Sequence, residues 1–325
     1  MGGKSYNIDK KGQIRSGETL HFRSATVEDL PALDEFASSN HWDLGRHNVR
    51  LLFDQSHELW ECVYNEKGEM IAFHCDNLMS EHFIYAYMIL IREDYRGQGI
   101  VQHFAYPFAE PNRVSASSTN FSITRFAARD FEIFLDRKIS FYGLVNRNGL
   151  KTLTVTHEQN FEIQPLTKSS LKDLLHYDRN IIQLDRAEFM TRWCADDTTM
   201  PENQGGCRVC YSSVAYDIKT GHLVGYGTLR WCDRYYQLSP MYADNEDVAL
   251  SLVVHLLNRV VDDDKPLFFL YLPSMAKQRV MHVIAKHFGM MQTEFETKNC
   301  NRRAWPYVRK IQHEKVYATH EYWPA

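Results

Sequence analysis

Two halves of the chain carry the same order of predicted elements, and this internal repeat limits the folds open to it. A short strand at residues 20–23 leads to Thr26, which caps a helix with apolar side chains at helical spacing. The same pattern returns at residues 161–164, followed by the capping residue Thr167. A chain of 325 residues exceeds what one hydrophobic core usually organises, so we expect two similar domains.

The repeat continues with a hairpin and a strong strand in each half. Turns at residues 67–69 and 220–222 each lie between apolar runs, which predicts β-hairpins. Strands are then predicted over Phe83–Ile91 and Tyr235–Leu238, each leading through a short loop into a helix. Asn245 caps the second of these helices, which carries one apolar stripe.

The remaining elements of the second half are a strand, a helix and two closing strands. We predict them over Pro266–Leu272, Lys277–His287, Gln292–Thr297 and Val316–Tyr322. The domain boundary is placed between about Asn146 and Phe161, giving domains over 18–150 and 160–325. Strands alternating with helices place the chain in the α/β (α+β) class.

Charge and composition exclude several function classes. Lys and Arg total 37 against 41 Asp and Glu, without a basic block, which disfavours nucleic acid and anionic membranes as partners. The apolar run Ile84–Ile91 is far shorter than the roughly 20 residues of a membrane helix. The first residues lack the apolar region of a signal peptide, so we expect a cytoplasmic protein.

Cysteine and histidine usage predicts neither a disulfide framework nor a metal site. Seven scattered cysteines fit reduced thiols, and the C-x-x-C pair Cys207 and Cys210 has no second pair to complete a zinc site. The 15 histidines show no ligand spacing, so no metal is expected.

The loop after the first strong strand is the strongest candidate for chemistry. Arg96-Gly97-Gln98-Gly99-Ile100 follows the strand that ends at Ile91. Two glycines beside an arginine allow backbone N–H groups to surround a diphosphate, and the N-terminus of a following helix would add favourable dipole charge. The alternative reading is a tight strand-to-helix turn.

This strand and loop resemble the acyl-CoA motif of the GNAT N-acetyltransferases. The resemblance implies two tandem GNAT-like domains, each with a mixed, mostly antiparallel, splayed sheet flanked by helices, and acetyl-CoA or another acyl-CoA as co-substrate. It implies that Ile89 and Ile91 flank the pantetheine arm and that the residues from Arg96 to Val101 (Arg96, Gly97, Gln98, Gly99, Ile100 and Val101) hold the pyrophosphate. Val101 stands where the family pattern has Gly or Ala, and its branched side chain could crowd the cofactor.

Residues 160–322 resemble the C-terminal domain of the YitH/HolE group of tandem GNAT proteins. The resemblance lies in Gly225-Tyr226-Gly227, in the run from Leu238 to Asp244 and in Phe295-Glu296-Thr297. Aligning the two loops sets Asp244 against Arg96 and Asp247 against Gly99. Acidic side chains would repel a diphosphate, so we assign CoA to the first half only.

Acetyl transfer needs a base for the amine and an acid for the departing thiolate. Glu81 and Tyr87 lie on or beside the strands that lead to the loop, where each is either a catalytic group or a hairpin charge or core aromatic. Many GNAT enzymes carry a Tyr acid in the helix after the fifth strand. The nearest stretch here, residues 133–138, has Leu135 at that position, and Tyr142 could substitute.

The leading hypothesis is an acyl-CoA-dependent N-acyltransferase in which an amine attacks the thioester directly in a ternary complex. We expect the acceptor to be a small amine rather than a protein. The alternative is a catalytically inactive GNAT-fold binding or scaffolding protein, favoured by Val101, Leu135 and the acidic loop of the second half.

Overall fold

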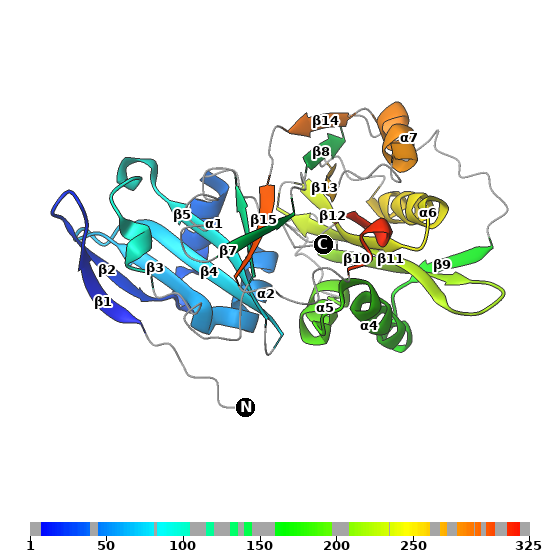
Figure 1. Ribbon diagram of the computed structural model, residues 1–325, viewed down its shortest axis with the longest axis horizontal. Coiled ribbons are helices and arrows are strands. Elements are labelled where there is room, and N and C mark those ends of the chain that lie inside the picture. Colours follow the sequence, from blue (N-terminus) through cyan, green and yellow to red (C-terminus); the bar gives the residue numbers. More distant parts are fainter. Residues whose placement is uncertain are drawn as a thin grey trace. The chain divides into compact units, whose positions relative to one another are not determined.

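Figure 1 shows the computed structural model of the chain. The structure describes residues 8–39, 45–80, 83–104, 115–119, 131–135, 140–144, 160–196, 208–233, 235–260, 267–271, 278–288, 290–293, 297–302 and 311–318. The contacts divide the chain into two compact units, Met1–Ala116 and Ser117–Ala325, and each is described by itself.

The first unit is built on a sheet in which consecutive strands are neighbours. Its strands are β1 (Asp9–Gln13), β2 (Thr19–Ser24), β3 (Trp60–Tyr64), β4 (Met70–Ser80), β5 (Phe83–Ile91) and β6 (Ser115–Thr119). All neighbouring pairs are antiparallel except β5 and β6, which run parallel. The helical segments are η1 (Val27–Asp29), α1 (Leu30–Ser39), α2 (Arg46–Ser56), η2 (His57–Leu59), η3 (Glu93–Tyr95) and η4 (Ile100–Gln102).

The second unit repeats this plan. Its main sheet has the order β14-β8-β13-β12-β11-β10-β9, with strands β8 (Ser140–Leu144), β9 (Phe161–Pro165), β10 (Cys210–Asp217), β11 (Leu223–Cys232), β12 (Tyr235–Ala243), β13 (Leu267–Tyr271) and β14 (Met290–Thr293). β16 (Val316–Ala318) also pairs with β12, while β7 (Phe131–Leu135) and β15 (Thr297–Arg302) pair with each other. The helical segments are α4 (Lys168–Ile182), α5 (Ala187–Cys194), α6 (Glu246–Leu257), η8 (Asn258–Val260), α7 (Gln278–Phe288) and η11 (His313–Lys315).

Helices cover both faces of the second sheet (Figure 1). The apolar stripe predicted for α6 is buried, and it packs against inward-facing side chains of β10, β11 and β12 such as Leu229 and Leu238. The opposite face is covered by α4 and α5, where the Trp193 indole donates to the Ser239 carbonyl at 3.1 Å. Mixed sheets flanked by helices in both units confirm the predicted fold class.

Most predicted elements are confirmed, including both hairpins, the bounds of β5 and the caps Thr26 and Thr167. Three expectations were wrong. Residues 131–135 form the strand β7, so Leu135 does not lie in a helix; Ile100 begins only the short turn η4; and the strand predicted at Gln292–Thr297 is replaced by the ends of two strands, β14 and β15.

The compact units divide earlier in the chain than the repeat suggested. The boundary we placed between about Asn146 and Phe161 falls inside the second unit, because β8 pairs with β13 and β14 of the second sheet. The units therefore differ from the predicted ranges 18–150 and 160–325 in the assignment of residues 117–150.

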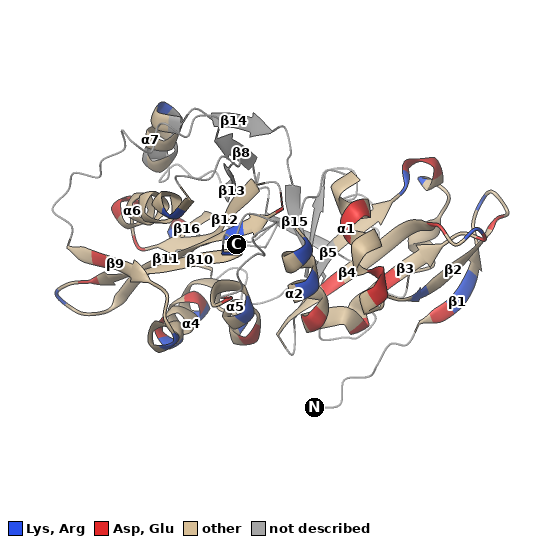
Figure 2. Ribbon diagram, turned by 180° about the vertical axis from the view of Figure 1, so that it is seen from behind, with Lys and Arg blue, Asp and Glu red and all other residues tan. Residues whose placement is uncertain are grey.

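Acidic and basic residues are both scattered over the described ribbon, and no long run of one sign stands out (Figure 2). No helix among the described residues is both long enough and apolar enough to cross a membrane.

The Asp29 carboxylate is a buried anchor of the first unit. It accepts two hydrogen bonds from the Arg23 guanidinium, both at 2.7 Å, one from the Tyr64 hydroxyl at 2.5 Å and one from the Thr26 amide at 2.7 Å. Burial alone would raise the pKa of Asp29, but these hydrogen bonds overcome burial and lower it from 3.8 to about 2.

We predict that Asp29 stabilises the first unit at neutral pH and that this stabilisation is lost in acid. The folded carboxyl binds its proton only near pH 2, so its contribution of about 2 kcal/mol is complete above pH 4 and is lost as the pH falls toward 2. Urea unfolding of the wild type and Asp29→Asn should differ most at neutral pH and converge in acid. A difference that stays constant with pH would contradict this.

A buried ion pair joins α4 and α5 to the second sheet. The Arg186 guanidinium donates to both oxygens of Asp178, at 2.8 and 2.6 Å, and to the Tyr242 hydroxyl at 3.0 Å. The Tyr226 hydroxyl also donates to Asp178. Arg186 and Asp178 are each 2% exposed.

We predict that Arg186→Met lowers the free energy of unfolding of the second unit by about 3–5 kcal/mol, because it leaves the Asp178 charge buried without its partner. Arg192→Met is the matched control, since Arg192 lies in α5 and its ion pair, with Glu188 at 3.2 Å, is exposed. That variant should change stability by less than about 1 kcal/mol. Equal effects of the two substitutions in urea unfolding would contradict the assignment.

Candidate functional site

The central strand of the first unit is paired along only part of one edge. β5 pairs with β4 along its length, but on its other edge it pairs with β6 only at Tyr85 and Ala86. Among the described residues, no strand pairs with residues 87–91 on that edge. The N–H and C=O groups there are available to an extended ligand, except the Ile91 carbonyl, which accepts from Arg96 Nε.

A bulge lies where β5 and β6 part. Cys75 is opposite Met88 and Asp76 is opposite Ala86, so Tyr87 has no partner in β4. An extra residue turns the backbone locally and is a frequent feature beside functional sites. The backbone of Tyr87, one of the predicted catalytic residues, therefore lies at the start of the open edge.

The predicted phosphate loop follows β5 directly. Gly97 and Gly99 have φ of 80° and 89°, a conformation that glycine adopts without strain. Among the described residues, the N–H groups of these glycines donate to no acceptor. The loop thus offers free amides close to the end of the open edge, as an anion cradle requires.

The side chains of the predicted cofactor residues have different surroundings. Ile89, Ile91 and Val101 are partly buried and pack against a core cluster that includes Ile100. Val101 thus packs partly against the core, and the expected crowding of the cofactor by its side chain stays a prediction. Arg96 is exposed, and its Nε donates to the Ile91 carbonyl at 3.1 Å, which ties the loop to the end of β5.

Sequence reasoning missed a second arginine at this loop. Arg15, in the turn between β1 and β2, donates from its guanidinium to the Gly97 carbonyl and from its backbone N–H to the Gln98 carbonyl, both at 3.1 Å. No sequence motif marks Arg15, because its partners lie far along the chain.

The structure describes the three predicted catalytic residues only in part. Glu81 lies outside the described residues, and Tyr87 is described only through its backbone. Tyr142 lies in β8, opposite Phe269 and Gln292, and so belongs to the second unit, whereas Tyr87 belongs to the first. Their roles remain predictions.

A buried acid–base pair lies in β4 next to the bulge. His74 Nε2 is 2.8 Å from Asp76 Oδ1, and the residues are 1% and 0% exposed. Burial raises the pKa of the Asp76 carboxyl, which the charge of His74 opposes. Because neither side chain reaches the surface, the pair supports the strand and does not itself meet an amine.

In the second unit the corresponding edge is occupied by the chain itself. β12 pairs with β13 at Tyr236, Gln237 and Leu238, after which the register against β11 shifts, as it does in β5. Beyond that point Met241 pairs with Ala318 and Tyr242 pairs with Val316 of β16. All three residues of β16 are buried. The edge that stays unpaired in the first unit is therefore filled in the second.

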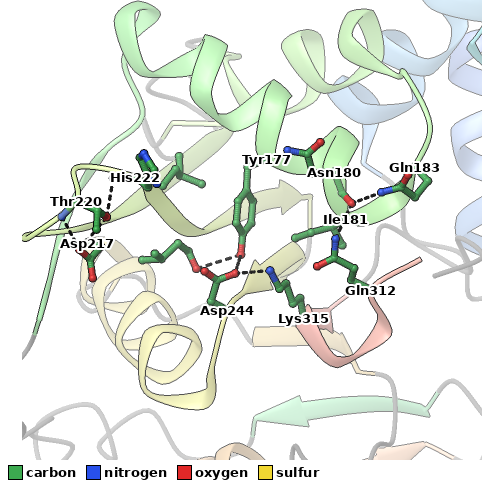
Figure 3. Close-up of a pocket in the computed structure, with 12 residues that line it drawn as sticks. Tyr177, Asn180, Ile181, Gln183, Asp217, Thr220, His222, Asp244, Gln312 and Lys315 are labelled. Carbon is green, nitrogen blue, oxygen red and sulfur yellow. Dashed lines mark hydrogen bonds and ion pairs between the residues drawn. The ribbon is translucent and has the colours of Figure 1, made fainter. Parts of the chain in front are cut away.

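A polar pocket of about 550 Å³ lies where the segment leading into β16 meets α4 and the end of β12 (Figure 3). Asp244 Oδ1 lies 2.8 Å from Lys315 Nζ and accepts from the Tyr177 hydroxyl at 3.0 Å. Burial raises the pKa of Tyr177, and the Asp244 carboxylate raises it further, so the hydroxyl remains a donor. Lys315 thus neutralises the carboxylate at the point where β16 begins.

The structure corrects the alignment of the two loops. The Arg92 amide donates to the Ile71 carbonyl, and the Asp244 amide donates to the Val224 carbonyl, both at 2.8 Å. Asp244 therefore corresponds to Arg92 and not to Arg96. In the second unit α6 begins at once, and its Val248 amide is capped by the Asn245 side chain at 3.0 Å. A loop like that of residues 96–99 is missing between β12 and α6.

Comparisons with known proteins agree with this architecture. Residues 174–318 match the family model of the acetyltransferase (GNAT) domain. No curated protein matches the chain.

Similar solved structures cover nearly the whole chain. A putative acetyltransferase from Pyrococcus horikoshii has a TM-score of 0.65 at 12% identity, over 93% of this chain and 95% of its own. A tandem GNAT protein from the clavulanic acid biosynthesis pathway has a TM-score of 0.57 at 11% identity, over 87% and 98%. A GCN5-related N-acetyltransferase from Sphaerobacter thermophilus has a TM-score of 0.54 at 13% identity, over 87% and 95%. At these identities the likeness shows the fold.

Two sheets with the same central irregularity, the family match in the second unit and the whole-chain structural likeness lead to one conclusion. Residues 174–318 match the acetyltransferase (GNAT) domain, and the chain has the fold of GNAT proteins, a tandem member among them.

Proposed function

We propose that the first unit binds an acyl-CoA and that the chain transfers the acyl group to a primary amine. The observation that carries the proposal is the unpaired edge of β5, which ends at a loop with free amides at Gly97 and Gly99. An extended amide-containing arm can pair with a strand edge as another strand does, while a diphosphate can accept from the loop. The cofactor family that joins such an arm to a diphosphate is coenzyme A.

The reaction proposed for this site is direct attack by the amine nitrogen on the thioester carbonyl. The N–C bond forms, the C–S bond breaks, the amine loses a proton and the CoA thiolate gains one. Holding both reactants in one site supplies most of the advantage, because it replaces a collision in solution. We also propose that Glu81 acts as the base and that Tyr87 lies beside the thioester.

The second unit is proposed to bind no CoA. Its β12 edge is filled by β16, and α6 starts without a loop of free amides. This filled edge also supports a scaffolding role for the second unit. It does not support the alternative that the first unit is inactive.

The acceptor is proposed to be a small amine, without nucleic acid or membrane as partner. The cytosol is the proposed location, because the five cysteines that the structure describes in full are free and buried, as expected in a reducing compartment.

We predict that titration calorimetry with acetyl-CoA gives one binding site per chain. Arg96→Glu should abolish binding, because it reverses the charge at the loop and removes the donor to the Ile91 carbonyl. Lys219→Glu makes the same charge change on an exposed turn of the second unit and should bind like the wild type.

Turnover decides between an enzyme and a silent binding protein. Thiol release from acetyl-CoA across a panel of amines should exceed background in the wild type and Lys219→Glu and vanish in Arg96→Glu. Binding without turnover on any amine would favour the scaffold. Absence of binding at millimolar acetyl-CoA, or a stoichiometry of two, would overturn the proposal.

A further inference from the structure

The hairpin of β1 and β2 holds the phosphate loop from outside. Three hydrogen bonds join them: two from Arg15 to the Gly97 and Gln98 carbonyls, and one from the Tyr95 hydroxyl to Glu18 at 3.1 Å. Near the turn of the hairpin, a Cβ added to Gly12 would lie 2.8 Å from His103 Nδ1, so β1 packs closely on the segment after the loop.

The contacts of Arg15 set the direction of the loop peptides. The carbonyls of two consecutive residues, Gly97 and Gln98, point toward Arg15. In a peptide unit the N–H points opposite to the carbonyl, so the amide that follows each of these carbonyls is turned away from Arg15. One of them is the Gly99 N–H, which has no acceptor among the described residues.

The positive charge of Arg15 is not neutralised by an ion pair among the described residues. Among the described residues, no carboxylate forms an ion pair with it, whereas Arg92 on the same loop pairs with Glu69 at 3.3 Å and Asp94 at 2.8 Å. The Arg15 side chain is exposed, and its Nε and Cγ would lie 3.9 Å from a Cβ added to Gly99. The guanidinium thus lies over the loop with donors to spare.

We infer that Arg15 is a positioning residue of the acyl-CoA site, which orients the peptide that carries the free Gly99 N–H and adds positive charge near the diphosphate. This rests on the proposed function of the first unit. The ligand group it serves is the diphosphate, because among the described residues its hydrogen bonds go to the Gly97 and Gln98 carbonyls of the loop and none goes to β5. β1 and the turn that carries Arg15, which precede the predicted domain start at residue 18, are thereby part of the cofactor site.

Binding of three ligands to Arg15→Gln tests the inference. Acetyl-CoA and its 3′-dephospho form both carry the diphosphate and should each bind about tenfold more weakly than to the wild type, the loss expected for a charge-assisted contact. S-acetyl-pantetheine lacks the diphosphate and should bind equally to both proteins.

Lys11→Gln is the matched control, since Lys11 is an exposed residue of the same hairpin and the change removes the same charge. It should bind all three ligands like the wild type. Arg15→Lys keeps the charge without the paired donors and should give an intermediate affinity. Far-UV circular dichroism and the melting temperature check that each variant is folded.

The outcomes separate the two levels of the account. The inference would be overturned if Arg15→Gln bound acetyl-CoA as tightly as the wild type does, or if it lost as much affinity for S-acetyl-pantetheine as for acetyl-CoA. Neither result would contradict the proposed function. A loss confined to acetyl-CoA that spares the dephospho form would place Arg15 at the 3′-phosphate and overturn the diphosphate assignment. Failure of the wild type to bind acetyl-CoA would instead remove the proposed function itself.

Discussion

The backbone of a strand at the edge of a sheet must find hydrogen-bond partners, and the two central strands of this protein meet that need differently. Each is paired with a parallel neighbour over a short stretch and then departs from it after a register shift. In the first unit residues 87–91 remain unpaired on that edge among the described residues. In the second unit β16 completes the sheet from within the same chain.

The loops after these strands follow the same division. Where the edge is open, η3 and two glycines separate β5 from η4. The loop between them keeps free amides, and hydrogen bonds from Arg15 and Arg96 fix its position. Where the edge is filled, Asp244 ends the strand, Lys315 neutralises it, and a capped helix begins at Glu246. One duplicated architecture thus provides one open edge and one closed edge. In the second unit the pair of Arg186 and Asp178 joins the helices to the sheet.

The sequence was informative where local chemistry decides the structure. Hairpin turns, the caps Thr26 and Thr167 and the apolar run of β5 depend on neighbouring residues, and these predictions were confirmed. Contacts between residues far apart in the chain could not be predicted from the sequence. β1 is a polar strand held by its pairing with β2, Arg15 acts on partners more than 80 residues away, and the insertion of β16 beside β12 depends on no local pattern. The alignment of Asp244 with Arg96 failed because the second strand was predicted to end at Leu238, whereas β12 continues to Ala243.

Amide hydrogen exchange with and without acetyl-CoA tests the central claim most directly, because it reports on both strand edges in one experiment. The account predicts that acetyl-CoA slows exchange in residues 87–91 and in the loop up to Gly99. Met241 and Tyr242, already paired with β16, should exchange slowly in both states. Slowing at β12 with no change at β5, or fast exchange at Met241 and Tyr242 in the free protein, would contradict it.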